Sequence, residues 1–523
     1  MTKQFAQKRS IWLLSPLLAA LLAALLVLPG CVRTPAPAPE AVALPTHSVS
    51  FVAPIGDAAL EYTGSATLYM PRFGTARLLS ITDTVAFSAA RLNAESITRA
   101  LLAHAGNGVA APLGGEVKLS LFGANPVEVS GGVATVNLSA SALQLDRATL
   151  YLCGQAFANT LTELPGIRYV NLLVMDKQIG LDLGSTLPTG ALTRSLTGDT
   201  YAPYEQALTQ RAQAGEDPAA KRLTATVTLY LPQASAVGVM SEARNITFAS
   251  QRPQDMALRL VEELAKGPAG ATSPALPLLA DLLLAPPDVT DGDGGSRIVT
   301  LRFDSALYDM LDTAGVARAS CYASLTYTLC TFLPNITGIM VYVGDERVDH
   351  VMLGATEGIL FDGGVQRRAH YAQQLLDEAT LYLADADGEH LVPVRRPVAF
   401  HQVHNPRGLM LMLLRGTVPE DRPPAAQPLL PASTLSDADI LGISLIDRVL
   451  VVNLSDSFRA AGAGLAAQQE RLLVYGLVNT LLCGDRATNV CFFVGGRPFE
   501  GFSGNIDWAG LFYESRGLAI QPE

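Results

Sequence analysis

Charged residues are scarce in this chain. Asp, Glu, Lys and Arg make up 16% of its 523 residues, whereas hydrophobic residues make up 49%. An average soluble protein carries about 25% charged residues. This composition excludes an intrinsically disordered chain, which needs low hydrophobicity and high net charge. The net charge of -11 argues against a nucleic-acid-binding protein, because no basic excess is available to neutralise phosphates. A polytopic membrane protein is the class left to test.

Long apolar runs are missing after the N-terminus. A membrane helix needs about 20 mostly apolar residues, and the closest later segment, 274–287, is shorter, contains Asp281 and ends in two prolines. The one long run, 11–28, follows three basic residues, which is the order found in a secretory signal peptide. Residues 1–30 are therefore interpreted as a signal peptide, and the rest of the chain as exported rather than polytopic.

A cysteine directly follows this signal peptide. Leu28, Gly30 and Cys31 form a pattern that resembles the lipobox of bacterial lipoproteins, in which the cysteine becomes the lipidated N-terminus. Pro29 departs from the usual Ala or Ser, and the alternative is a plain signal anchor with an incidental cysteine. Residues 31–58 are Ala/Pro-rich, as is typical of an extended tether. The pattern predicts a protein held by lipid on the extracytoplasmic face of the cell membrane.

Three internal repeats organise the remaining sequence. Each repeat has an opening strand pattern, a first amphipathic helix, a central strand, a very apolar second helix and a last strand. The opening strands are 66–71, 227–232 and 379–384; the first helices are 94–105, 253–266 and 406–415. The central strands are 133–139, 298–304 and 449–455; the second helices are 149–164, 320–333 and 470–482; the last strands are 169–175, 339–343 and 490–494.

This order predicts an α+β fold, with three tandem copies of a small sheet that carries two helices on one face. The domains are expected at 59–195, 223–353 and 375–515, with linkers at 196–222 and 354–374.

Two of the repeats resemble the GerMN domain. In the third repeat the resemblance lies in residues 380–394, in Val-Asn-Leu-Ser at 452–455 and in 475–481; in the first it lies in 136–139 and 159–167. The middle repeat has diverged, with Arg-Phe-Asp at 302–304 in place of the Asn-Leu-Ser piece. The chain is thus similar to GerM-like lipoproteins of spore-forming bacteria. Three domains are a departure from the two of the members compared.

The resemblance implies a ring-building-motif-like fold and a role in sporulation or germination. It further implies a non-enzymatic scaffold whose partners are envelope proteins of a sporulation-type complex, and it leaves homo-oligomerisation open. The alternative from another class is a lipoprotein that binds an envelope ligand such as a peptidoglycan fragment.

The sequence contains no G-x-S-x-G, Walker-type, H-E-x-x-H or paired C-x-x-C motif for catalysis, metals or cofactors. His401 and His404 lack a second ligand cluster, so a polar pair before a helix is favoured over a zinc site. Asp385, Asp387 and Glu389 begin like a calcium loop, but the closing Glu is missing and a hairpin turn explains them. We therefore expect no catalytic residue, no metal and no cofactor.

The six cysteines include Cys31, which leaves an odd number for the folded part. Three are expected to be packed thiols on apolar helix faces: Cys153, Cys321 and Cys330. Cys483 and Cys491 bracket the turn before the last strand. In an exported protein they could form a disulfide or stay as two thiols, and the sequence does not choose between these.

Two polar residue types recur at matching positions of the repeats. Asn137 and Asn453 end the central strands, and they are either functional or, as is favoured, satisfy local backbone groups. A tyrosine recurs in each opening strand, where an aromatic packed near the sheet edge is the favoured interpretation: Tyr69, Tyr230 and Tyr382.

Overall fold

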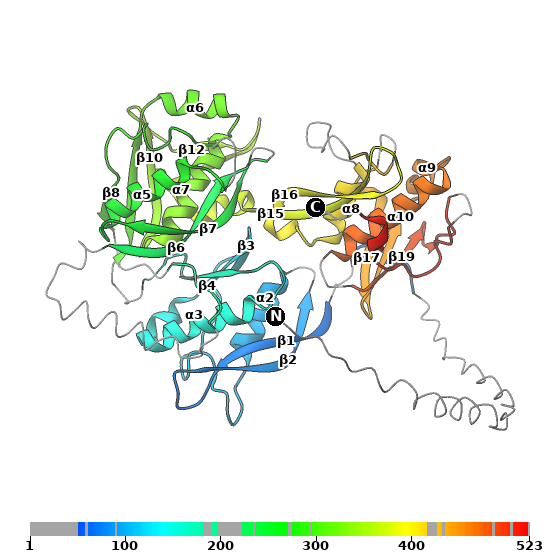
Figure 1. Ribbon diagram of the computed structural model, residues 1–523, viewed down its shortest axis with the longest axis horizontal. Coiled ribbons are helices and arrows are strands. Elements are labelled where there is room, and N and C mark those ends of the chain that lie inside the picture. Colours follow the sequence, from blue (N-terminus) through cyan, green and yellow to red (C-terminus); the bar gives the residue numbers. More distant parts are fainter. Residues whose placement is uncertain are drawn as a thin grey trace, which may run out of the picture. The chain divides into compact units, whose positions relative to one another are not determined.

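Three α+β repeats follow one another along the chain in the computed structural model (Figure 1). The structure describes residues 51–57, 61–88, 91–178, 180, 190–195, 222–233, 236–269, 275–292, 295–415, 426–430, 435–483, 487–502 and 506–520. The predicted signal peptide, Cys31 and nearly all of the predicted linker 196–222 lie outside these residues.

An antiparallel hairpin opens each repeat and forms a sheet of its own. The three hairpins are β1 (Glu61–Pro71) with β2 (Leu78–Ser88), β6 (Leu223–Pro232) with β7 (Val239–Phe248), and β15 (Leu376–Ala384) with β16 (Leu391–Ala399). Successive side chains of a strand point to opposite faces, and the buried face of β1 carries Leu68 and Met70, both 0% exposed. The hairpins thus each offer one apolar face to a helix.

A second, mixed sheet completes each repeat. In the first repeat it contains β3 (Val127–Ser130), β4 (Val133–Leu138) and β5 (Tyr169–Val174); in the third, β17 (Ile440–Ile446), β18 (Val449–Leu454), β19 (Asn489–Val494) and β20 (Arg497–Pro498). The middle repeat has β8 (Asp288–Asp291), β9 (Arg297–Phe303), β10 (Ile336–Val343), β11 (Glu346–Arg347) and β14 (Val365–Gln366), and a separate hairpin of β12 (His350–Met352) and β13 (Gly358–Leu360). The central and last strands run parallel, so a crossover must join them.

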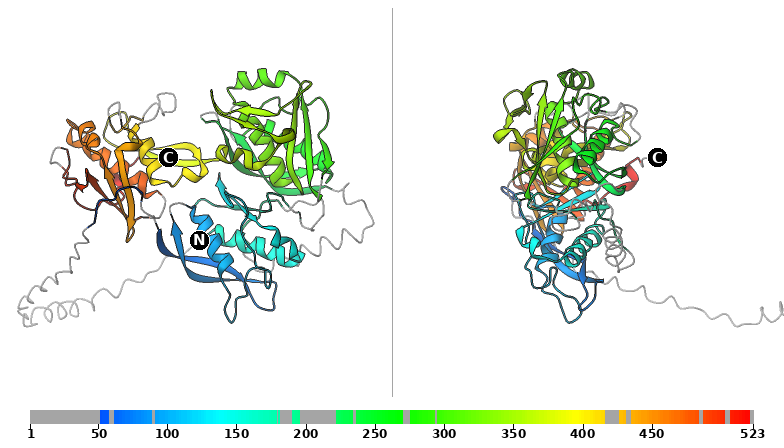
Figure 2. Two further views of the ribbon diagram at one scale, coloured as in Figure 1. Left: turned by 180° about the vertical axis from the view of Figure 1, so that it is seen from behind. Right: turned by 90° about the vertical axis from the view of Figure 1, so that its left-hand side faces the viewer.

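The second helix of each repeat is this crossover. The first helices are α2 (Asn93–Ala103), α5 (Pro253–Ala265) and α8 (Pro406–Arg415), and the second are α3 (Arg147–Leu161), α7 (Arg318–Phe332) and α10 (Ala467–Leu482). Shorter helices are α6 (Ala306–Ala314), α9 (Asp456–Ala461), η1 (Ala140–Gln144), η4 (Asp362–Gly364), η5 (Arg368–Gln374), η6 (Phe400–Gln402), η8 (Asp437–Asp439) and η9 (Arg516–Leu518). The elements can be followed from two further sides in Figure 2.

The second helices lie between the two sheets of their repeats. Helix α7 contacts both β6 and β10, and every residue of it after Arg318 is buried. Helices α3 and α10 likewise contact a hairpin strand and a strand of the mixed sheet. The sequence predicts one sheet with both helices on one face; the structure instead divides the strands into two sheets with the second helix between them. A helix covered on two sides must be apolar all round, which explains its composition.

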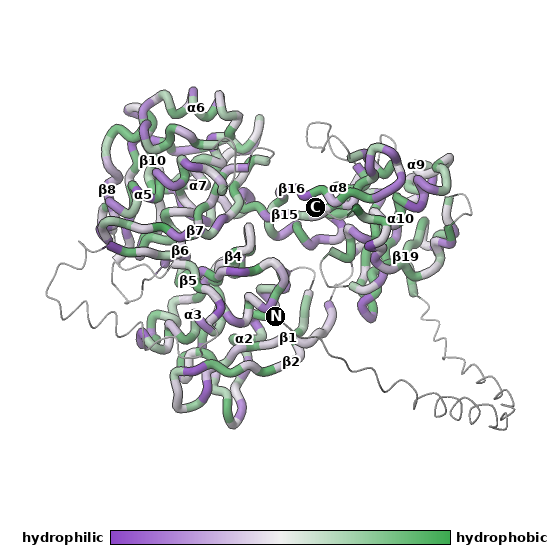
Figure 3. Tube along the Cα trace, viewed as in Figure 1, coloured by the Kyte–Doolittle hydropathy of each residue, from purple (hydrophilic) through white to green (hydrophobic). Residues whose placement is uncertain are grey.

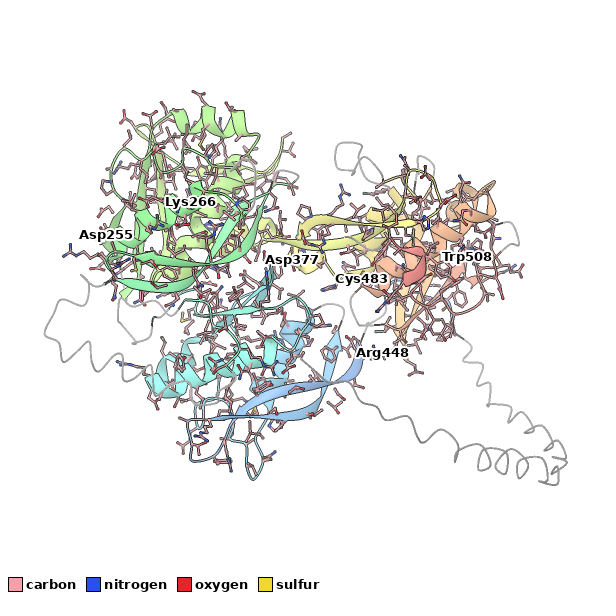
Figure 4. All side chains as sticks on the ribbon, viewed as in Figure 1. Asp255, Lys266, Asp377, Arg448, Cys483 and Trp508 are labelled. Atoms are coloured by element: carbon pink, nitrogen blue, oxygen red, sulfur yellow. The ribbon has the colours of Figure 1, made fainter. Side chains whose placement is uncertain are left out.

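Two hydrophobic cores hold these layers together. One cluster runs through the first and middle repeats, from Leu68 to Phe400, and a separate one fills the third, from Ala379 to Leu518. Hydrophobic residues accordingly occur throughout all three repeats (Figure 3). In the third core Trp508, labelled in Figure 4, is 0% exposed and donates its indole N–H to Glu470 at 2.8 Å.

The stretch 354–374, expected as a Gly-rich linker, is folded into the middle repeat. Strand β14 pairs with β10, and Phe361 and Tyr371 belong to the hydrophobic core. Without β14 the backbone groups on that side of β10 would need other partners, which is the physical reason for the pairing. Among the residues that the structure describes, no helix combines the length and the apolar character needed to cross a membrane.

Candidate functional site

One hydrogen bond recurs in all three repeats and joins the opening hairpin to the second helix. The hydroxyl oxygens of Thr160, Thr328 and Thr480 accept from the backbone N–H groups of the repeated tyrosines at 2.9, 3.1 and 3.0 Å. Alternate N–H groups of a two-stranded hairpin point away from the partner strand and need another acceptor when buried. The sequence pattern predicts a packing role for the tyrosine rings, whereas the hydrogen bond that all three repeats share is donated by the tyrosine backbone.

In the first and third repeats, which we call the outer repeats, an asparagine precedes this threonine and hydrogen-bonds to the segment that follows the repeat. We call this hydrogen bond the pin. Asn159 accepts from the backbone N–H of Ser195 at 3.0 Å, and Asn479 accepts from that of Ser515 at 2.8 Å. Each serine lies 36 residues after its asparagine. The Asn-Thr-Leu motif therefore has a structural role. Its threonine bonds to the opening hairpin, and its asparagine bonds to the segment after the repeat.

The strand-end asparagines satisfy backbone groups as well. Asn137 accepts from the N–H of Asp176 at 3.0 Å, and Asn453 accepts from the N–H of Gly496 at 3.1 Å. Both bonds fasten the turn after the last strand to the central strand. The favoured interpretation of these residues is confirmed.

The middle repeat carries a tyrosine, Tyr327, at the position of the pinning asparagine. The guanidinium of Arg368 lies over its ring, 4.4 Å from the centroid. Arg368 is 4% exposed, donates to Thr331 and forms an ion pair with Glu128 of the first repeat, which is 12% exposed. Burial raises the pKa of Glu128, and the Arg368 charge opposes that rise. A buried charge pair thus joins the first and middle repeats.

The turn between β3 and β4 brings all three repeats together. Ser130, 2% exposed, accepts from the N–H of Ser241 at 3.0 Å and donates to the carbonyl of Leu376. Gly131 donates its N–H to the carboxylate of Asp377 at 3.0 Å. Gly131 has a φ of +54°, and a Cβ there would lie 1.8 Å from the carbonyl oxygen of Ser241. Only glycine therefore fits at this junction.

A cleft of about 780 Å³ opens beside the junction turn. It is lined by acidic and basic side chains from the three repeats, among them Arg168, Glu242, Asp377, Glu378 and His404. Burial raises the pKa of Asp377 to about 6, although the bond from Gly131 opposes the rise. Asp377 lies on β15, where Figure 4 labels it. The cleft can therefore offer both charge signs to a polar ligand.

The five cysteines that the structure describes form no disulfide. Cys153, Cys321 and Cys330 are buried, as expected of packed thiols, and burial raises the pKa of each to about 12. Cys483 and Cys491 form no disulfide. Val490 and Phe492 face the core that α10 fills, so the intervening Cys491 points to the opposite face of β19, away from Cys483 at the end of α10.

The candidate metal ligands do not converge. His401 lies in η6 and His404 in the turn before α8. Asp385 accepts from the backbone N–H groups of Glu389 and His390 at 2.8 and 3.1 Å, as a hairpin-turn residue does. In the described part of the chain, no group of three or more His, Cys, Asp or Glu residues could hold a metal ion. Cys31, the predicted lipidation site, lies outside the described residues.

A protein-family comparison matches each repeat once. The model described as "Germane: Sporulation and spore germination" matches residues 67–180, 228–349 and 380–500, which together cover more than half of the chain. No curated protein sequence matches significantly.

Solved structures with detectable similarity include the tandem GerMN domains of the sporulation protein GerM from Bacillus subtilis. The identity is 18%, the match covers 58% of this chain and 99% of that one, and the TM-score is 0.21. The first GerMN domain of the same protein matches with 19% identity over 27% and 98% of the two chains and a TM-score of 0.21. A putative lipoprotein from Clostridium perfringens matches with 19% identity over 26% and 87%, and a TM-score of 0.18.

Proposed function

Because the chain belongs to the Germane family of sporulation and spore germination, we propose that it is a lipid-anchored assembly protein on the extracytoplasmic face of the membrane. It acts by binding other envelope proteins and catalyses no reaction. The polar residues that recur between repeats, Thr160, Asn159 and Asn137 in the first, are used to fasten the fold. The observation that carries the binding role is the exposure of large apolar side chains at two places on the surface.

Exposed apolar side chains support a binding role. Phe73 is 57% exposed and Val109 is 55% exposed, and a backbone hydrogen bond of 3.0 Å joins the two loops that carry them. In the middle repeat Leu360 is 80% exposed and Met352 49% exposed on the β12–β13 hairpin. Large apolar side chains that gather at the surface are typical of protein–protein contacts.

Affinity capture from envelopes of sporulating cells tests the binding role. The tagged full chain is expected to retain envelope proteins, and a Phe73→Ser/Val109→Ser variant is expected to retain fewer of them. Tyr513→Ser is the control, because Tyr513 is 63% exposed in the third repeat, which carries neither patch. Capture that does not depend on either patch, or no captured protein at all, would contradict the proposal.

Membrane fractionation tests the anchor. Cys31→Ala removes the predicted lipidation site, so the protein should move to the soluble extracytoplasmic fraction. A variant that has lost its signal peptide and still stays with the membrane would show that Cys31 is not the anchor.

The cleft beside Asp377 favours a second candidate function, the binding of a peptidoglycan fragment. Such fragments carry carboxylates and amines, and Arg168 and Asp377 offer the complementary charges. Calorimetric titration with purified cell-wall fragments should give saturable binding that Arg168→Ala weakens. Equal heats from wild type and variant would remove this candidate.

A further inference from the structure

The last residues of the predicted tether contact the third repeat, which comes almost 400 residues later in the sequence. We call residues 52–57 the strap. The backbone N–H of Gly56 donates to the carbonyl of Leu441 on β17 at 2.8 Å. The side-chain amide of Asn453 donates to the carbonyl of Pro54 at 2.9 Å. The strap therefore hydrogen-bonds to the β17 edge of this mixed sheet through its backbone, with a bend at Gly56, whose φ is +71°.

A two-pronged ion pair closes the strap. Arg407 of α8 donates from Nε and Nη2 to the two carboxylate oxygens of Asp57, at 2.7 and 2.8 Å. Its remaining nitrogen Nη1 donates to Asp437 at 3.2 Å. Parallel bonds between a guanidinium and a carboxylate are stronger and more directional than single ones. The hydrogen bonds that Arg407 donates to Asp57 are the main cause that raises the pKa of Arg407.

The third repeat leaves room for the strap backbone at one glycine. Gly442 stands opposite Asn453 where the register of β17 and β18 shifts. A Cβ on Gly442 would lie 2.6 Å from the carbonyl oxygens of both Pro54 and Gly56. The strap side chains contribute little packing, since Val52 is 77% and Ile55 is 94% exposed. The third repeat therefore holds the strap by backbone hydrogen bonds and by the Arg407–Asp57 ion pair rather than by burial of apolar side chains.

The equivalent asparagine of the first repeat does something else. The side-chain amide of Asn137 donates to Asp176 within its own turn at 2.6 Å. Asn453 instead uses its amide N–H to hold Pro54 while its oxygen holds the turn. The asparagine at this position is thus structural in the first repeat, whereas in the third repeat Asn453 also binds the strap.

We propose that the β17 edge, with Asn453 and Arg407, is a receptor site for the strap and fastens the end of the predicted tether to the third repeat. Asn453 and Pro54 are 399 residues apart, so the docked strap joins the chain before the first repeat to the last repeat.

Hydrogen exchange on the full mature chain, made soluble by Cys31→Ser, tests the docking. The Gly56 amide should exchange about tenfold faster in Arg407→Ala and in Asp57→Ala than in wild type, because each loses the ion pair. The double variant should exchange no faster than either single variant. Asp57→Ala changes only the strap, so it keeps the test valid if Arg407→Ala impairs folding. Arg395→Ala is the control, since Arg395 is 71% exposed in an ion pair with Glu378. Exchange that Asp57→Ala leaves unchanged would overturn the receptor site.

Discussion

The first and third repeats differ from the middle repeat in the side chain at one matching position of the second helix. The first and third use Asn159 and Asn479 to pin the following segment, whereas the middle one has Tyr327 under a buried arginine. The middle repeat does not need this bond, because the segment that follows it forms strand β14, which pairs with β10. The threonine that holds the hairpin is kept in all three. The fold thus requires the threonine, while the asparagine position is free to build a contact between repeats.

The largest expected effect comes from breaking the contact that only the middle repeat makes. Arg368→Met should lower the free energy of unfolding by about 3–5 kcal/mol, because it leaves Glu128 buried without a partner charge. Adding Glu128→Gln removes that charge and should recover most of the loss. Urea denaturation measures both. A double variant as unstable as the single one would show that the pair contributes through packing rather than charge.

Asp377 gives the junction of the three repeats a pH dependence. Its pKa is raised to about 6 by burial, whereas an unfolded Asp titrates near ~3.9. The folded state therefore binds this proton more tightly, so the contribution of Asp377 to stability is largest below about pH 4 and falls as pH rises to about 6, by at most about 3 kcal/mol. Above that window this contribution stays constant.

Asp377→Asn keeps an acceptor for Gly131 and should remove this part of the pH dependence. Denaturant titrations at several pH values measure it. Asp387→Asn, in the exposed turn of the same hairpin, is the matched control. Identical pH profiles for wild type and Asp377→Asn would assign the slope to other groups.

The shared threonines should contribute similar amounts to the free energy of unfolding in all three repeats. Replacing Thr160, Thr328 or Thr480 by Val keeps the shape but leaves a hairpin N–H without its acceptor, at a cost of about 1–3 kcal/mol each. Denaturation of the three single variants measures this. A much smaller loss in the middle repeat would mean that its divergence extends to the scaffold.

The smallest effect is expected at the pins of the outer repeats. Asn159→Ala or Asn479→Ala should cost about 1 kcal/mol and should speed hydrogen exchange at Ser195 or Ser515. Asn245→Ala is the control, because Asn245 makes an exposed bond to Thr226 on the hairpin of the middle repeat. Unchanged exchange at both serines would show that the pins are dispensable in the outer repeats too.

Local patterns predicted the elements well. The first helix of the third repeat, 406–415, has the bounds that its proline and apolar spacing indicate, and the second helices agree to within a few residues. The backbone role of Asn137 and Asn453 also followed from their place at strand ends. The division into two sheets did not follow, since an apolar helix is equally compatible with one covering layer or two. Nor did the face of Cys491, which depends on the register of β19.

The sequence by itself determined that three α+β repeats follow one another, because periodicity, capping and the repeated Thr-Leu-Tyr and Asn-Thr-Leu pieces are local signals. Only the tertiary structure decided which polar groups meet. Ser130 and Leu376 are 246 residues apart, and Asn453 and Pro54 are 399 apart. Such pairs leave no periodic trace, because hydrogen-bond and charge partners are chosen by the packing of the layers rather than by spacing along the chain.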